Sequence, residues 1–251
     1  MGLTSNACGW SANRETFGIK RNGSIPVIAL AGNPNTGKTT VFNALTGLNQ
    51  HTGNWPGKTV LRAEGCYAFN GREHLVVDLP GTYSLLASSA EEQVARDFLC
   101  LANPDATVVV VDATCLERNL NLVLQVLEIT PRVIVAVNLI DEAARKNIHI
   151  DCRRLAGELG VPVVATAARY GKGIDELKAV IAEMAGNQVS TSPRLVTYDT
   201  SLERSIRFLE PRLKDILPPY LSARWAALRI LEGDPYIFNT LHHFFEGGGQ
   251  R

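Results

Sequence analysis

A run of eight residues combines glycines, a lysine and a hydroxyl side chain at a spacing that suits phosphate binding. The run is Gly32-Asn33-Pro34-Asn35-Thr36-Gly37-Lys38-Thr39, and it lies between an apolar stretch and a helical pattern. Glycines let the backbone curl so that successive N–H groups point at a phosphate, and the start of a helix adds a favourable dipole. Lys38 would bring its charge to the β- and γ-phosphate oxygens, and Thr39 would offer its hydroxyl to Mg²⁺. The pattern predicts a nucleotide-binding P-loop that extends to Thr40.

A second motif, Asp78-Leu79-Pro80-Gly81, closes an apolar strand farther along the chain. An aspartate at a strand end can hold Mg²⁺ through water, and the N–H of Gly81 can reach a γ-phosphate. Such a tetrapeptide alone is a common turn. Its place two strands after a P-loop favours the nucleotide role for Asp78 and Gly81.

A third motif indicates which base the nucleotide carries. Asn138-Leu139-Ile140-Asp141 follows the apolar run 132–137. Asp141 can pair there with the N1–H and 2-amino groups of guanine, which adenine does not offer, so ATP would leave site groups unpaired. In the alternative, Asp141 only caps the next helix. Many GTPases carry lysine where this chain has Leu139, and its absence removes one stacking stem over the base.

Two loops would complete the site. Thr166-Ala167-Ala168 ends the last strand of the pattern, where a backbone N–H can meet guanine O6. The glycine-rich loop 50–60 precedes the second strand and would act as a first switch. We expect Thr59, rather than Thr52, to bind Mg²⁺ from this loop. Trp55 in the same loop is either a core anchor or a mobile lid.

Alternating strand and helix patterns would position these motifs. Short apolar runs predict six strands, at 26–31, 60–69, 73–79, 106–113, 132–138 and 162–167. Helical spacing predicts helices at 38–47, 91–102, 118–129, 151–159 and 173–185. Intervening helices imply right-handed crossovers, and Asn70-Gly71 adds a hairpin with one antiparallel edge strand. The fold class we expect is α/β, a Ras-like P-loop GTPase with a mainly parallel six-stranded sheet flanked by helices.

The remaining chain predicts a second, smaller unit. Helical patterns at 202–213, 219–231 and 235–245 indicate a small C-terminal all-helical domain. Serine and threonine cluster at 187–193, which we interpret as a linker. The expected organisation is an N-terminal extension at 1–24, the GTPase domain at 25–187, the helical domain at 188–246 and a tail at 247–251.

Composition bounds the class of protein. Of 251 residues, 45% are hydrophobic and 20% charged, and the formal net charge is zero, which argues against nucleic acid as a partner. The five cysteines have no metal-ligand spacing, so a reducing compartment is expected. The start shows no signal-peptide pattern, and no apolar run is long enough for a bilayer. We therefore expect this polypeptide to be soluble.

Several of these segments together resemble one family. They are Gly32–Thr39, Gly53-Asn54-Trp55-Pro56-Gly57, Asp78–Gly81, Asp112-Ala113-Thr114-Cys115-Leu116-Glu117-Arg118-Asn119-Leu120 and the helical stretch Ala223–Asp234. The chain resembles, over about residues 25–240, the N-terminal G domain and helical regulatory domain of the ferrous iron transport protein B family. The two segments at 53–57 and 112–120 discriminate far better than the P-loop does.

The resemblance implies a slow GTPase attached to a membrane permease for Fe²⁺, on the cytoplasmic side of a bacterial cell membrane. The partners would be GTP or GDP and the permease region of a longer protein, with a homo-oligomer possible. It also implies hydrolysis stimulated by K⁺, which Asn35 would bind with the carbonyls of Gly53 and Trp55. A cation there would neutralise charge between the β- and γ-phosphates. The alternative for Asn35 is a turn-stabilising asparagine.

The catalytic group that orients water is not identifiable from the sequence. Thr82 and Tyr83, and no glutamine, follow Gly81. Backbone groups around Gly57 and Lys58 are the fallback, beside Lys38 and Asn35, so turnover should be low. Lys58 departs from the family's usual small apolar residue; its charge either assists the monovalent cation or points to solvent.

Two other functions compete with a GTP-hydrolysing regulator of an iron permease. One is a nucleotide-sensing switch without significant hydrolysis, which turnover with and without K⁺ would distinguish. The other is a GTPase associated with RNA or the ribosome. That reading predicts a basic accessory domain, whereas the charges of residues 199–234 are balanced.

Overall fold

A computed structural model describes residues 13–19, 25–48, 50–86, 89–234 and 237. Its centre is a seven-stranded sheet in the order β2-β3-β4-β1-β5-β6-β7. The strands are β1 (Val27–Gly32), β2 (Gln50–Asn54), β3 (Leu61–Phe69), β4 (Arg72–Asp78), β5 (Ala106–Asp112), β6 (Val133–Asn138) and β7 (Val163–Ala165). β4, β1, β5, β6 and β7 are parallel, whereas β2 and β3 run antiparallel at one edge.

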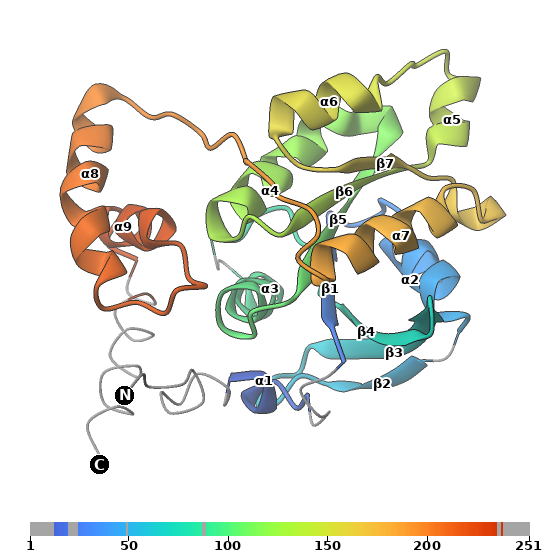
Figure 1. The fold of residues 1–251 in the computed structure, drawn as a ribbon, viewed down its shortest axis with the longest axis horizontal. Coiled ribbons are helices and arrows are strands. Elements are labelled where there is room, and N and C mark those ends of the chain that lie inside the picture. Colours follow the sequence, from blue (N-terminus) through green and yellow to red (C-terminus); the bar gives the residue numbers. More distant parts are fainter. Residues whose placement is uncertain (1–12, 20–24, 49, 87–88, 235–236, 238–251) are drawn as a thin grey trace.

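Helices cover both faces of the sheet (Figure 1). They are α2 (Lys38–Thr46), α3 (Ala90–Leu101), α4 (Leu116–Ile129), α5 (Ile140–Arg145), α6 (Cys152–Leu159) and α7 (Ile174–Ala185). Side chains of β1 alternate between the two layers. Ala29 faces the layer of α3 and α4, and Ile28 faces that of α2 and α7. A strand buried on both faces is apolar throughout, which is why these runs stand out in the sequence.

Side-chain caps fix where several helices begin. Ser89 accepts a hydrogen bond from the N–H of Glu92 at the start of α3, and Asp151 accepts one from Arg154 at the start of α6. Each cap satisfies an N–H that the first helical turn leaves without a partner. The short helix α5, which the sequence did not predict, instead follows Leu139 in a left-handed conformation (φ 62°).

The fold class is confirmed, but the sheet has seven strands instead of six. The extra strand, β2, lies in the segment expected to be the first-switch loop. Gln50–Asn54 has no apolar alternation, so its pattern predicts a loop. It pairs through its backbone with β3, with Asn54 opposite Leu61. An edge strand of this kind leaves little trace in side-chain periodicity.

Part of the N-terminal extension is packed onto the domain. Asn13–Thr16 forms a four-residue helix, α1, and Ile19 is buried at 4% exposure. The sequence predicted an N-terminal extension at 1–24, and residues 13–19 of that extension pack on the GTPase domain. Residues 1–12 and 20–24 lie outside the described part.

The helical unit contains α8 (Thr200–Lys214) and α9 (Ala223–Leu231), which pack on each other beside the sheet domain (Figure 1). Within it, Arg224 forms an ion pair with Glu203 at 2.7 Å. The guanidinium of buried Arg96 in α3 joins the two units through the carboxylate of Asp234 at 2.8 Å. Of the third helix that the sequence predicts, 235–245, only Ile237 is among the described residues, and the 247–251 tail lies outside them. No helix in the described ranges has the length and apolarity to cross a membrane.

Candidate functional site

The P-loop lies between the end of β1 and the start of α2, as the spacing predicts. Two of its glycines are required by close contacts. A Cβ on Gly32 would lie 2.6 Å from the carbonyl oxygen of Val110, and one on Gly37 would lie 2.4 Å from Nδ2 of Asn138. Gly37 also has a φ of 78°, which favours glycine. Any side chain at either position would displace the loop.

Asp78 and Lys38 meet at the end of β4. The Lys38 ammonium contacts the Asp78 carboxylate, and its Nζ donates to the carbonyl oxygen of Leu79 at 2.6 Å. Burial raises the pKa of the Asp78 carboxyl, and the charge of Lys38 opposes that shift. The positive group of the P-loop and the acid of the second motif are therefore neighbours, as a phosphate and Mg²⁺ site needs.

The segment after Asp78 also touches the P-loop. The N–H of Thr82 donates to the carbonyl oxygen of Gly32 at 3.3 Å. A Cβ on Gly81 would lie 3.5 Å from the backbone of Pro34. The second motif thus lies against the phosphate loop, and Gly81 is at the contact.

Asn138 connects three loops, a role that the sequence analysis missed. Its Nδ2 donates to the carbonyl oxygen of Thr36 in the P-loop at 3.0 Å. Its Oδ1 accepts from the hydroxyl of Thr166 and from the N–H of Ala168, both at 3.1 Å. Because a carbonyl only accepts and an N–H only donates, these partners fix the orientation of the amide. Asn138 is 1% exposed. In this conformation it holds the site together, while its polar groups all bond to protein.

Asp141 is the acidic group of the third motif that stays accessible. It lies in the first turn of α5, and its Oδ2 pairs with Arg145 at 2.9 Å. The pair is an exposed contact within one helix, which contributes little to stability. Asp141 does not cap α5, since the helix begins after Leu139 without a side-chain cap. Its carboxylate is therefore free of the structural role that the alternative assigned to it.

The loop after β7 uses its own N–H groups within the protein. Thr166 donates from its backbone to the carbonyl oxygen of Val137, Ala167 to that of Lys172, and Ala168 to Asn138. The sequence predicted that an N–H of 166–168 would meet guanine O6. In this conformation all three have protein acceptors, so that contact stays a prediction.

Trp55 is a core anchor. It is 2% exposed, and its ring packs edge-on against Phe98 of α3 at a centroid distance of 5.5 Å. The guanidinium of Arg62 lies over the same ring at 5.4 Å. The N–H of Trp55 donates to the carbonyl oxygen of Val60 at 2.9 Å, which closes the loop between β2 and β3. The sequence left the choice between anchor and lid open because either role suits a tryptophan in a glycine-rich loop.

The other residues of the first switch lie apart from the P-loop. Gly53 lies in β2, and β3 and β4 separate that strand from β1. Thr59 and Lys58 are exposed, and the Lys58 ammonium points to Oε1 of Gln93 in α3 at 3.3 Å. The structure therefore does not bring these groups to the phosphate loop in this conformation.

Asn35 lies exposed in the P-loop with a φ of 67°. Asparagine tolerates this left-handed conformation better than most residues. The backbone alone thus accounts for an asparagine here, and a role in K⁺ binding stays a prediction.

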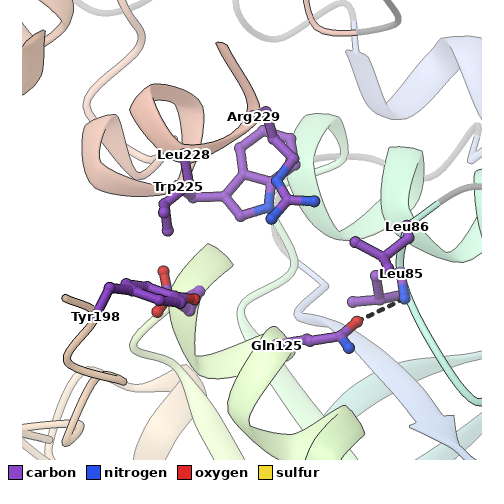
Figure 2. A pocket seen from close by; sticks show the side chains of 8 residues that line it. Leu85, Leu86, Gln125, Tyr198, Trp225, Leu228 and Arg229 are labelled. Carbon is purple, nitrogen blue, oxygen red and sulfur yellow. Dashed lines mark hydrogen bonds between the residues drawn. The ribbon is translucent and has the colours of Figure 1, made fainter. Parts of the chain in front are cut away.

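A small pocket lies between the helical unit and the segment that follows Gly81. Oε1 of Gln125 in α4 accepts from the N–H of Leu85 at 2.7 Å. Figure 2 shows this bond at a small pocket that is also lined by Tyr198 and by Trp225 of α9. No motif of the sequence marked Gln125, since its role depends on α4 lying beside this segment.

These loops, gathered at the carboxyl ends of parallel strands, define a P-loop GTPase fold. Oxygen donors such as those of Thr39 and Asp78 fit the preference of Mg²⁺, and the glycine cradle fits a phosphate. The chain belongs to the ferrous iron transport protein B family. Residues 26–181 match that family's profile, and residues 198–247 match the FeoB cytosolic helical domain.

Relatives and solved structures agree with this assignment. The Fe(2+) transporter FeoB of Salmonella typhimurium is 43% identical over 213 residues, which are 83% of this chain and 27% of that protein. The chain thus spans about a quarter of the length of the curated relatives it matches. The cytosolic domain of T. maritima FeoB in apo form aligns with a TM-score of 0.80 at 40% identity, covering 88% of this chain and 86% of that one. Its GMPPNP form gives 0.79 at 39%, with the same coverage.

Proposed function

We propose that this chain binds GTP and GDP and hydrolyses GTP slowly, as the regulatory portion of a ferrous iron transporter. The observation that carries the proposal is the network of Asn138, which ties the P-loop to the third motif and to the loop after β7. A nucleotide held on the P-loop would therefore have its base beside Asp141. Structures of the T. maritima relative in GDP and GMPPNP forms support the proposal.

Specificity for guanine would rest on Asp141. Its carboxylate can accept from two donors of guanine, whereas adenine presents none there. A site group left unpaired on binding the wrong base costs about 1–3 kcal/mol or more. That cost corresponds to at least about fivefold discrimination against ATP. Leu139 stands where many GTPases have a lysine whose aliphatic chain stacks on the base. Its absence lowers the affinity for GTP and for ATP alike.

The phosphates would be held by the P-loop backbone and by Lys38. For that, the Lys38 ammonium would turn from Asp78 toward the β- and γ-phosphate oxygens. Thr39, Thr59 and Asp78 would hold Mg²⁺, which supplies positive charge to the phosphate oxygens. Thr59 lies in the exposed loop beyond β2, so its part requires that loop to move.

Stimulation by K⁺ is part of the proposal. Asn35, with the carbonyls of Gly53 and Trp55, would supply oxygen ligands for the ion. The Trp55 carbonyl here accepts the N–H of Lys58 at 3.0 Å, and Gly53 pairs with β3. Gly53 lies in β2, which β3 and β4 separate from β1, so the loop would have to move toward Asn35 before its carbonyls could join a K⁺ site.

Hydrolysis should be slow. The residue after Gly81 is Thr82, which is buried at 5% exposure, and next comes Tyr83, whose ring lies under the guanidinium of Arg118 at 4.5 Å. Neither offers the side-chain amide that orients water in many GTPases. Backbone groups around Gly57 and Lys58 are left for that task. The absence of a side-chain amide at Thr82 and Tyr83 favours a second candidate function, a nucleotide sensor with negligible turnover.

The wider role follows from the family. The matched relatives are Fe(2+) transporters, and the matched structures are cytosolic domains. We infer that the chain acts on the cytoplasmic side of a membrane, attached to a permease region, with units at 25–187 and 188–246. A homo-oligomer is part of the same proposal.

The test compares release of phosphate from GTP and ATP by the whole chain, in KCl and in NaCl. We expect hydrolysis of GTP only, faster in KCl. Asn35→Ala should remove the difference between the salts. Asn147→Ala is the matched control because Asn147 also has a left-handed φ, 56°, outside the P-loop.

Equal rates in the two salts would reject the K⁺ site. Nucleotide binding without turnover would leave the sensor as the function. Lys38→Ala should abolish binding of either guanine nucleotide, and retained affinity in that variant would reject the P-loop assignment itself.

A further inference from the structure

The segment before the family domain packs directly against the first switch. The family match begins at residue 26, so residues 13–19 lie outside it. Their helix α1 nevertheless lies beside β2 and β3 in the fold (Figure 1). Residues 13–19, which the family profile does not cover, thus lie where they can act on the first switch.

An aromatic cluster makes the contact. Phe17 packs edge-on against Trp55, with ring centroids 6.2 Å apart, and against Phe98 of α3 at 5.4 Å. The three rings close on one another, since Trp55 and Phe98 are also in contact. Edge-on aromatic contacts of this kind are favourable beyond the area they bury. Phe17 therefore stabilises Trp55 in its buried position.

The segment has its own anchors on the domain. Arg14 donates to the carbonyl oxygens of Ala102 at 3.0 Å and Asn103 at 2.6 Å, and it pairs with Asp105 at 3.2 Å. Ile19 is buried in the same core as α3. None of these partners belongs to the first switch. Residues 13–19 are thus fixed to the body of the domain, and this places Phe17 against Trp55.

Trp55 in turn sets the conformation of the switch. With its ring buried, the preceding residues pair with β3 as β2. Neighbouring strands are about 4.8 Å apart, so β2, three strands from β1, lies on the order of 14 Å across the sheet from it. When Trp55 is buried, the first switch is therefore turned away from the P-loop.

The buried position of Trp55 is imperfect. Its indole Nε1 is buried with no hydrogen-bond partner among the described residues. A buried donor without an acceptor carries a free-energy cost. If Trp55 left this buried position, its indole N–H could donate to water. The buried position therefore depends on ring packing such as that of Phe17.

We propose that residues 13–19 form a strap that holds the first switch in its strand-paired conformation, with Phe17 as the holding contact. The proposal rests on the proposed function, in which the switch moves to meet GTP. The strap stabilises only the strand-paired conformation, so it lowers the population that is ready for GTP. A ligand selects between two such conformations only through a difference in affinity. GTP, whose γ-phosphate the switch would meet, is therefore opposed by the strap, whereas GDP is not.

The experiment measures the affinities of GMPPNP and GDP for the whole chain by calorimetry. Phe17→Ala removes the ring, and Arg14→Ala releases the anchor without touching Trp55. Phe17→Leu keeps an apolar side chain against Trp55, so it should change GMPPNP affinity less than Phe17→Ala does. Phe208→Ala is the control, because Phe208 is 60% exposed in α8 and lies under the guanidinium of Arg212 in the helical unit.

We expect Phe17→Ala to tighten GMPPNP binding by about three- to tenfold, the range of a 0.7–1.4 kcal/mol change, with GDP affinity unchanged. Arg14→Ala should act in the same direction. Weaker binding of both nucleotides would show that Phe17 only supports the fold, and unchanged affinities would also overturn the proposal.

Hydrogen exchange separates the strap from the proposed function. In the protein without nucleotide, Phe17→Ala should speed exchange of the amide protons that pair β2 with β3. The amides of β6, which pairs with β5 and β7 and not with β2 or β3, should keep their protection, which also shows that the variant is folded. Unchanged β2 exchange refutes the strap even if GTP binds as proposed, whereas faster exchange in a protein that fails to bind nucleotide rejects only the function.

Discussion

Replacing Asn138 by alanine tests whether this side chain holds the site together. Its amide makes one bond to the P-loop and two to the loop after β7. Each such bond contributes on the order of 1 kcal/mol net, and a buried partner left unpaired costs more. Asn138→Ala should therefore lower the free energy of unfolding by about 3 kcal/mol. For a chain of this length that corresponds to a fall in Tm of roughly 6–12 °C.

Two comparisons make the result specific. Asp141→Ala removes a carboxylate whose only described contacts are exposed pairs within α5, so its Tm should stay near that of the parent. Asn119→Ala removes a second buried asparagine, which accepts from the N–H of Asp112 and donates to Cys115. It should destabilise the fold to a similar degree without joining the three loops of the site.

Thermal unfolding and GDP titration of the three variants together decide the question. We expect Asn138→Ala to lose both stability and affinity, Asp141→Ala to lose guanine selectivity alone, and Asn119→Ala to lose stability with little effect on affinity. If Asn138→Ala unfolds at the temperature of the parent protein, the network is not the support that its geometry implies.

Two further predictions concern Glu128, a buried acid in α4, and the contact between the end of α6 and the linker. Burial raises the pKa of Glu128, although Arg224 and Arg229 oppose the shift. The folded protein then binds this proton more tightly than the unfolded chain, so stability falls as pH rises above the ordinary glutamate range. Glu128→Gln should raise Tm at pH 7, and its advantage should vanish near pH 4; an advantage that grows on acidification would reverse the sign we assign. Gly160 has a φ of 72°, and its Cβ would lie 1.9 Å from the carbonyl oxygen of Ser192, so Gly160→Ala should cost about 1–3 kcal/mol in denaturant unfolding. Gly157→Ala in α6, where a Cβ meets nothing within 4 Å, should be neutral or stabilising, and equal losses in the two variants would contradict the clash.

The sequence predicted the parts of the site that depend on local spacing. Gly32, Gly37 and Lys38 lie where the motif puts them because a strand, a tight loop and a helix leave little choice. Asp78 and Lys38 come together because β1, which leads into the P-loop, is the parallel neighbour of β4, with Leu30 opposite Asp78. A six-strand sheet was also close, since buried parallel strands have a clear apolar pattern.

The parts that the sequence missed depend on contacts between distant segments. The multiple bonds of Asn138 arise only when three loops converge, and no spacing within one motif shows that. β2 forms by backbone pairing, so its side chains carry no alternation. Phe17 is one aromatic residue in a polar stretch, and only the position of Trp55 gives it a partner. The linkage of Gln125 to Leu85 likewise requires α4 beside the second motif.

The buried ion pair of Arg96 with Asp234 has a consequence for how the protein can be divided. Its two residues are 138 positions apart in the chain, and the guanidinium is 1% exposed at the side chain. Cutting the linker would leave this bond intact, so the two pieces should stay together as a nicked complex. Expressing the GTPase unit alone would instead remove that carboxylate from Arg96, whose guanidinium would keep the neighbouring Asp97 at 3.9 Å. The GTPase unit in isolation is therefore a different molecule from the one that works beside α9.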